Sequence, residues 1–391
     1  MRTRKDIEDI ENQILAPYAM KSRDSKGREH DNTEHEVRTC YQRDRDRIVH
    51  SEAFRKLEYK TQVFVIIEGD YYRTRLTHTI EVAQIARTIG RSLRLNEDLI
   101  EAVALAHDLG HPPFGHAGEE ALNRIMGDKG GFNHNFRSYE IVTRFEKRYP
   151  DFIGLDLTRE VLVGILKHST VYDQAVELDQ FKNEGPTLEA RVVDIADAVA
   201  YLSHDIDDGL TSGCLTVDDM MDSALWRKAY SKIQSVFDPG HGAMMKYQVV
   251  KYLIDQQTRD LLNFSTENLR RHNFGSSNQV KEFHLKNPDG NVIEFSPQMK
   301  KERGELQNLL LEKLYRHYRV LRMTEKAKRM INEIFDVYLE NPNQLPYEIW
   351  PRGAQYSGKE KYQIICNYIA GMTDRSALDE YKKLFDPHKK V

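Results

Sequence analysis

A short apolar run, AVALA at residues 102–106, is followed directly by His107 and Asp108, and this combination leaves few folds open. Residues 96–98 make a good helix start before the run, and the glycine and prolines of residues 110–113 make a stop. The run therefore predicts a buried helix that ends in an imidazole and a carboxylate. Burying both groups is costly unless they bind something, and a cation satisfies both. The partial negative charge at the end of the helix favours a cation there as well.

Apolar residues at helical spacing also predict helices over residues 76–93, 159–168 and 187–209. Beyond residue 215 the pattern stays helical, with one exception. The segment VKEFHLKNPDGNVIEFSP alternates on either side of Pro288–Asp289–Gly290, which predicts a small β-hairpin near residues 280–297. The chain is therefore predicted to be mainly α.

We expect three parts along the chain. Residues 1–37 are polar and highly charged and are predicted to form a mobile or interface arm. Residues 38–214 hold the histidine and aspartate motifs and form one helical domain. Residues 215–391 form a mostly helical C-terminal domain that contains the hairpin.

Composition excludes several classes of protein. The 391 residues are ample for a sizeable core, and 57 Lys and Arg against 61 Asp and Glu give a net charge of −4, which argues against a basic nucleic-acid coat. No apolar stretch approaches the roughly 18 residues of a membrane span, and the start MRTRKDIEDIENQ has no signal-peptide core. Three widely spaced cysteines fit a reducing compartment, so we expect a cytoplasmic protein.

Five of the fifteen histidines fall between residues 78 and 134, and they are His78, His107, His111, His116 and His134. Further metal ligands are needed from other helices, and His78 and Asp197 are the candidates. On the helix over residues 187–209, Asp194, Asp197, Tyr201 and Asp205 share one face; a solvated acidic stripe is the alternative interpretation. Mixed histidine and carboxylate ligands suit manganese, iron, cobalt, zinc or magnesium.

The order His78, His107–Asp108, Asp197 resembles the pattern of the HD superfamily of metal-dependent phosphohydrolases. The resemblance is closest to the deoxyguanosinetriphosphate triphosphohydrolases and their dNTPase-like relatives. It rests on segments in order from about residue 38 to 385, among them RTRLTHTIEVAQIAR, HDLGHPPFGHAGEEAL, GGFNHNFRSYEIV, LTREVLVGILKH, LEARVVDIADAVAYLSHDIDDGL and NYIAGMTDRSALDEY.

The resemblance implies an HD domain over residues 38–214 in which His78, His107, Asp108 and Asp197 hold one divalent metal ion. Water would attack the α-phosphorus of a deoxynucleoside triphosphate and release the deoxynucleoside and intact triphosphate. His116 and Glu119 would be the general acid/base pair. His111 and His134 would donate protons or contact phosphate, although His111 could instead cap the loop at Pro112 and Pro113.

Cations must also neutralise the leaving triphosphate. The candidates are Arg38, Arg55, Arg75, Lys167 and His168, and Arg75 with Lys167–His168 are favoured by position. By resemblance, Gln62 and Asp205 reach the 3′-hydroxyl, and Tyr201 stacks beneath the ribose or is an ordinary core tyrosine. Asp374 serves the base end or caps a helix.

Two rival functions remain open at this point. One is an HD phosphohydrolase that acts on nucleoside monophosphates, cyclic nucleotides or nucleic-acid ends. The other is a non-enzymatic nucleotide sensor or nucleic-acid-binding protein, against which the His116 and Glu119 pair argues, because a sensor needs no proton transfer. Relatives commonly form rings built from dimers, often hexamers, so the resemblance implies a homo-oligomer. It also implies a regulatory dNTP or single-stranded DNA as a further partner.

Overall fold

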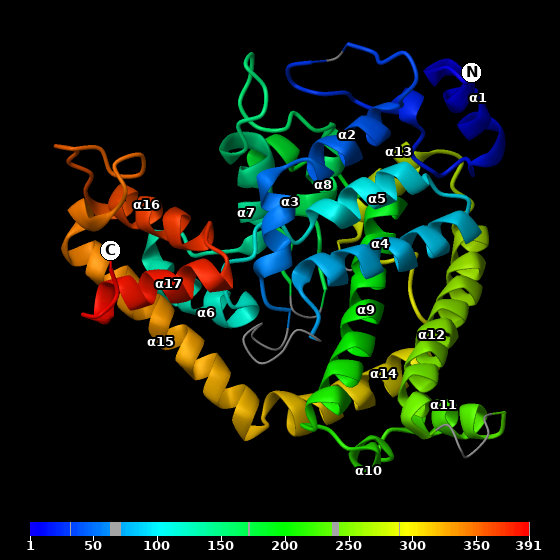
Figure 1. Ribbon diagram of the computed structural model, residues 1–391. Helices are drawn as coiled ribbons and strands as arrows, with labels where there is room; N and C mark the ends of the chain where they lie inside the picture. The colour runs from blue at the N-terminus through cyan, green and yellow to red at the C-terminus, as the bar shows by residue number, and fades with distance from the viewer. Residues whose placement is uncertain (32, 63–71, 171–172, 237–241, 289, 391) are drawn as a thin grey trace.

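The computed structural model describes residues 1–31, 33–62, 72–170, 173–236, 242–288 and 290–390, and over these ranges the protein is mainly helical (Figure 1). The first nine helices are α1 (Arg4–Ile14), α2 (Cys40–Val49), α3 (Glu52–Lys56), α4 (Arg75–Ser92), α5 (Glu97–Ala106), α6 (Gly115–Met126), α7 (His134–Glu140), α8 (Arg159–Leu166) and α9 (Leu188–Ser212). The remaining helices are α10 (Val217–Met220), α11 (Ala224–Gln234), α12 (Gly242–His272), α13 (Ser277–Lys286), α14 (Pro297–Leu310), α15 (Tyr318–Glu340), α16 (Gly358–Ala370) and α17 (Asp374–Phe385).

Helices α4, α5 and α9 pack against one another at the centre of the molecule (Figure 1). The side chain of Asn96 caps α5 by accepting from the backbone N–H groups of Asp98 and Leu99, as the sequence predicts. Residues 102–106 of this helix are buried, so α5 delivers His107 into the protein interior. Thr187 caps the start of α9, and Gly213 ends this helix in the left-handed conformation with φ +70°.

The core has two main hydrophobic clusters. The larger runs from Ala19 to Val320 and includes α4, α5, α9, α11, α12 and α14. The smaller joins α6 to α15, α16 and α17 and contains Leu122, Phe335 and Ile369. Helices beyond residue 215 thus contribute to both clusters, while the domain boundaries proposed from the sequence stay predictions.

The N-terminal segment is folded over its described residues. Thr3 caps α1 with a capping box, and Ala19 and Met20 are buried in the larger cluster. Arg28 pairs with the buried carboxylate of Asp44. These contacts attach the N-terminal segment to the larger hydrophobic cluster and to α2.

The β-hairpin predicted near residues 280–297 is wrong. Residues 277–286 form α13, no strand occurs among the described residues, and Asp289 of the expected turn lies outside them. Ser276 caps the helix, and the buried residues Val280, Lys281 and His284 follow a helical spacing. Tertiary packing of that face therefore outweighed the apparent two-residue alternation. In the described part of the chain, every helix is too short or too polar to cross a membrane.

Candidate metal centre

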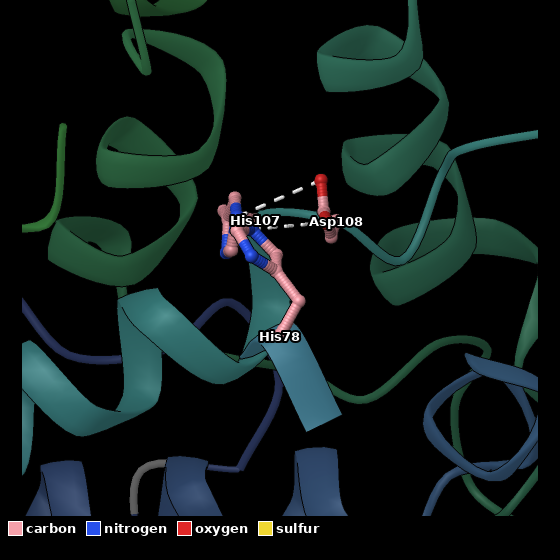
Figure 2. A group of neighbouring side chains, drawn as sticks. All are labelled: His78, His107 and Asp108. Atoms are coloured by element: carbon pink, nitrogen blue, oxygen red, sulfur yellow. Dashed lines mark ion pairs between the residues drawn. The ribbon is translucent and has the colours of Figure 1, made fainter. Parts of the chain in front are cut away.

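His107 and Asp108 lie at the end of α5, where they face His78 from α4 (Figure 2). All three side chains are buried, and their ligand atoms lie within 4.8 Å of one another. The His107 Nδ1–H points to the carbonyl oxygen of Ala104 at 2.7 Å. The same ring's Nε2 is buried and has no hydrogen-bond partner among the described residues. Because a buried, unpaired nitrogen is costly, a cation at this point fits the geometry.

Asp197 reaches the same point from α9. Its Oδ1 lies 2.9 Å from His78 Nε2, and it groups with His107 and His168 as a further set of possible ligands. Burial raises the pKa of Asp197, but hydrogen bonds from His168 and His78 outweigh it and hold the pKa well below its usual range. The structure therefore brings together all four ligands that the sequence predicts. Their donor set, two imidazoles and two carboxylates, fits a divalent metal ion.

His168 and Asp194 support this cluster from the side. His168 Nδ1 lies 2.7 Å from Asp194 Oδ1, and its Nε2 faces Asp197 Oδ2 at 3.5 Å. Burial lowers the pKa of His168, but these carboxylates raise it well above its usual value. The sequence suggested His168 as a contact of the triphosphate, whereas in the structure it contacts Asp197, a predicted metal ligand. The Oδ2 of Asp173, a residue that the sequence analysis did not identify, lies 3.7 Å from His168 Nε2.

The other four predicted catalytic side chains form a second polar group beside the first. His111 and His134 stack with ring centroids 3.8 Å apart, and His111 Nε2 lies 3.1 Å from Asp108 Oδ1. Glu119 binds His134 most closely, at 2.9 Å from Nδ1, whereas His116 Nδ1 lies 3.7 Å from the carboxylate. Burial lowers the pKa of His134, but Glu119 and Asp173 raise it above its ordinary value. The Glu119 carboxylate therefore contacts three imidazoles, those of His134, His116 and His111, rather than His116 alone.

A cavity connects both groups to residues from the C-terminal half. The residues that line it include His78, Asp108, His111, His116 and Asp197, together with Gln62, Tyr201, Gln307, Leu310 and Tyr315. Asp205 is fully buried behind this wall and accepts a hydrogen bond from the Tyr315 hydroxyl, and burial raises its pKa well above the usual range. Gln62 Oε1 and Asp205 Oδ1 are both buried without a hydrogen-bond partner among the described residues.

Comparison with known proteins agrees with this geometry. The HD domain model matches residues 75–202, and the phosphohydrolase-associated domain model matches residues 293–383. The chain is 47% identical over 379 residues to the deoxyguanosinetriphosphate triphosphohydrolase-like protein of Geobacter metallireducens, covering 96% of each chain. The proteins of the same description from Geobacter sulfurreducens and Ralstonia pickettii are 46% and 45% identical, over 98% and 95% of this chain and 98% and 94% of their own lengths.

The chain belongs to the deoxyguanosinetriphosphate triphosphohydrolase-like family. It carries an HD-type phosphohydrolase domain, and the cluster of possible metal ligands falls inside the matched range. The resemblance inferred from its motifs is thereby confirmed. The phosphohydrolase-associated domain includes Gln307, Leu310 and Tyr315, so both matched domains of this family member line the same cavity.

The predicted cationic residues separate into two groups. Arg75 lines the cavity and donates from Nη1 to Asp108 Oδ2 at 2.9 Å. Lys167 instead pairs with Glu177 and does not line this cavity. Arg38 pairs with Asp46 at 2.6 Å, and Arg55 donates to the His50 carbonyl oxygen at 3.3 Å.

Asp374, for which the sequence left open the base end of the substrate or a helix cap, also lies outside the cavity. Its carboxylate accepts from the backbone N–H groups of Thr61 and Phe114 and from the Thr61 hydroxyl. Asp374 is the first residue of α17, so it ties this helix to the loop that precedes α6. The start of α17 is capped by Thr373, whose side chain accepts from the Ser376 backbone N–H.

Sequence reasoning missed Asp173, Gln307 and Tyr315, each of which lines the cavity. Asp173 had one usable signal, because it follows His168 by five residues in a polar segment. Gln307 and Tyr315 had none, since their side chains reach the site from more than 100 positions beyond Asp197.

Proposed function

We propose that this protein hydrolyses deoxynucleoside triphosphates, dGTP or dNTPs generally, to the deoxynucleoside and inorganic triphosphate. Water attacks the α-phosphorus. One observation carries the proposal: a single cavity contains the cluster of His78, Asp108 and Asp197, the guanidinium of Arg75, and the polar side chains of Gln62 and Tyr201. The printed names of the relatives, deoxyguanosinetriphosphate triphosphohydrolase-like proteins, support the choice of substrate.

The side chains divide the work by position. His78, His107, Asp108 and Asp197 hold one divalent ion, which when bound polarises a phosphoryl oxygen and lowers the pKa of water. This donor set suits manganese, magnesium, iron, cobalt or zinc. Arg75 binds phosphate oxygens at the charged end of the substrate, because its Nη2 and Nε lack other partners among the described residues.

Proton transfer belongs to the histidine group. His116 lies half-exposed at the cavity wall and donates a proton to the 5′-oxygen of the leaving deoxynucleoside. Glu119 orients His134 at 2.9 Å, and His134 with the stacked His111 completes the set of donors around the phosphates. The raised pKa of His134 favours its charged form, which offsets the negative charge of the triphosphate.

We assign the sugar to the remaining polar side chains around the same cavity. We assign the 3′-hydroxyl to Gln62 Oε1, which lines the cavity without a hydrogen-bond partner among the described residues, and to Asp205 Oδ1, which is unpartnered behind the cavity wall. The ring of Tyr201 packs against the ribose and disfavours a 2′-hydroxyl. Lys167 and Asp374 have other partners, so we assign them no substrate contact. A homo-oligomer and a regulatory nucleotide stay predictions of the resemblance, as does a cytoplasmic location.

The test is a product analysis. Purified protein is incubated with each dNTP and with Mn²⁺, Mg²⁺ or chelator, and the products are separated by ion-exchange chromatography. We expect metal-dependent release of intact triphosphate, with loss of roughly 100-fold or more in rate for His116→Ala. His50→Ala, which removes an exposed histidine at the end of α2, is the matched control and keeps the parent rate. Orthophosphate or pyrophosphate as the product, or an unchanged rate for His116→Ala, contradicts the proposal.

A further inference from the structure

A second buried histidine lies directly behind the proposed ligand His78. His204, on α9, places its Nδ1 3.1 Å from His78 Nδ1, and the two rings meet edge to face with centroids 5.3 Å apart. Both side chains are 1% exposed. Two imidazole nitrogens at this distance share one proton, so one ring donates and the other accepts.

The far side of His204 decides which ring donates. Its Nε2 forms an ion-pair contact with Glu81 Oε2, and Glu81 lies on α4 three residues after His78. This contact lacks hydrogen-bond geometry, but a carboxylate beside Nε2 favours the proton of His204 on that nitrogen, which leaves Nδ1 as an acceptor. When His78 Nε2 ligates a metal ion, it no longer donates to Asp197 Oδ1, which lies 2.9 Å away, and His78 then donates from Nδ1 to His204.

Glu81 is itself held in place. Arg73 Nε lies 3.4 Å from Glu81 Oε1, and the Arg73 guanidinium also contacts Asp207 at 2.9 Å and Asp208 at 2.8 Å on α9. The carboxylate therefore sits in a fixed frame between α4 and α9. Because Arg73 fixes Glu81, the Glu81 carboxylate faces Nε2 of the His204 ring and not its Nδ1.

We propose that Glu81 and His204 are positioning residues that hold His78 as the Nδ1–H tautomer and so present its Nε2 to the metal ion. The opposite tautomer would donate from Nε2 to Asp197 and could not ligate a metal. His107 reaches the same state by a different route, because its Nδ1 meets the Ala104 carbonyl oxygen. This inference rests on the metal role proposed for His78.

The test is the affinity of chelator-treated protein for Mn²⁺, measured by isothermal titration calorimetry. We expect His204→Leu, which removes the acceptor behind His78, to raise the Kd roughly 10- to 100-fold. His204→Asn restores most of the affinity, because its side-chain oxygen lies near the position of the imidazole Nδ1. Glu81→Leu raises the Kd less, but in the same direction.

A matched control separates the effect of the Glu81–His204–His78 contacts from a general effect of charge. Glu101→Gln removes a carboxylate on α5 that also pairs with an arginine, Arg87, but contacts no histidine in the described structure, and it leaves the Kd unchanged. Melting curves of the metal-free proteins verify folding. If His204→Leu does not fold, Glu81→Leu, at a side chain that is 40% exposed, carries the test.

Two results overturn the inference. One is a Kd within about twofold of the parent for the folded variants. The other is an equal loss for His204→Leu and His204→Asn, because packing alone would explain it. The readout is metal binding and not catalysis. A parent protein that binds Mn²⁺ but releases no triphosphate therefore refutes the proposed function without contradicting the positioning role of Glu81 and His204.

Discussion

Arg75 does two tasks that a lysine in its place could not do together. Its Nη1 donates to the carboxylate of Asp108, a proposed metal ligand, while Nη2 and Nε are buried with no hydrogen-bond partner among the described residues. The guanidinium is therefore fixed by one edge and presents further donors to the cavity that it lines. A planar fork permits this division, whereas an ammonium group is one compact charge.

We therefore expect Arg75→Lys to lower kcat/KM for dNTP hydrolysis by roughly thirtyfold, which corresponds to about 2 kcal/mol for a lost charge-assisted hydrogen bond. Lys167→Gln is the comparison, because Lys167 was an equal candidate by sequence but pairs with Glu177 away from the cavity. Its loss should stay below about fivefold. Initial rates of triphosphate release over a range of dNTP concentrations measure both effects. Equal losses in the two variants would remove the phosphate role from Arg75.

At the scale of the elements, Gly110 allows α7 to pack against the loop after α5. A Cβ at this position would lie 2.1 Å from the His134 carbonyl oxygen and 2.3 Å from the Ser138 backbone nitrogen. These are backbone atoms, so they cannot rotate away as a side chain would. The close approach also lets the Gly110 N–H donate to Ser138 Oγ, which in turn donates to the His107 carbonyl oxygen.

We expect Gly110→Ala to destabilise the protein by about 1–3 kcal/mol, the usual cost of overpacking, and to displace His134 from Glu119. Gly304→Ala, in the middle of α14 with nothing within 4 Å of the added Cβ, is the matched control. It should be neutral or stabilise by up to about 1 kcal/mol, because alanine favours helix over glycine. Urea unfolding and triphosphate release measure the two effects. A Gly110→Ala protein with parent stability and activity would show that α7 tolerates the shift.

The same packing explains which elements the sequence could predict. The start of α5 and the helices that carry His78 and Asp197 follow from local signals, namely the Asn96 cap and apolar residues at helical spacing. In α13, Val280, Lys281 and His284 are buried at helical spacing, but the alternation and the turn sequence pointed to a hairpin. The contact between Asp205 and Tyr315, 110 positions apart, depends on how α9 and the segment after α14 meet, which no local pattern records.

On the scale of the whole molecule, the buried carboxylate of Glu189 joins three segments far apart in sequence. Its Oε1 accepts from the backbone N–H of Met20 at 2.9 Å and from that of Asn96 at 3.2 Å, while Glu189 itself lies in the first turn of α9. Burial raises the pKa of Glu189 to about 7, against an ordinary value of 4.5, and these backbone donors only partly offset it. Ionisation of this one side chain therefore acts on the stability of the entire fold.

The sign of the effect follows from proton binding. Between about pH 4.5 and 7 the folded protein keeps the Glu189 proton while the unfolded chain loses it, so the free energy of unfolding falls as pH rises through this window and levels off above it.

Glu189→Gln stays neutral and retains an acceptor oxygen for Met20 and Asn96. We expect the variant to match the parent near pH 5 and to exceed its stability at pH 8 by up to about 3 kcal/mol. Glu325→Gln, at an exposed carboxylate paired with Lys328, controls for the change in net charge. Urea unfolding of all three proteins from pH 5 to 8 measures the difference, and parallel curves for Glu189→Gln and the parent would mean that Glu189 does not titrate in this range.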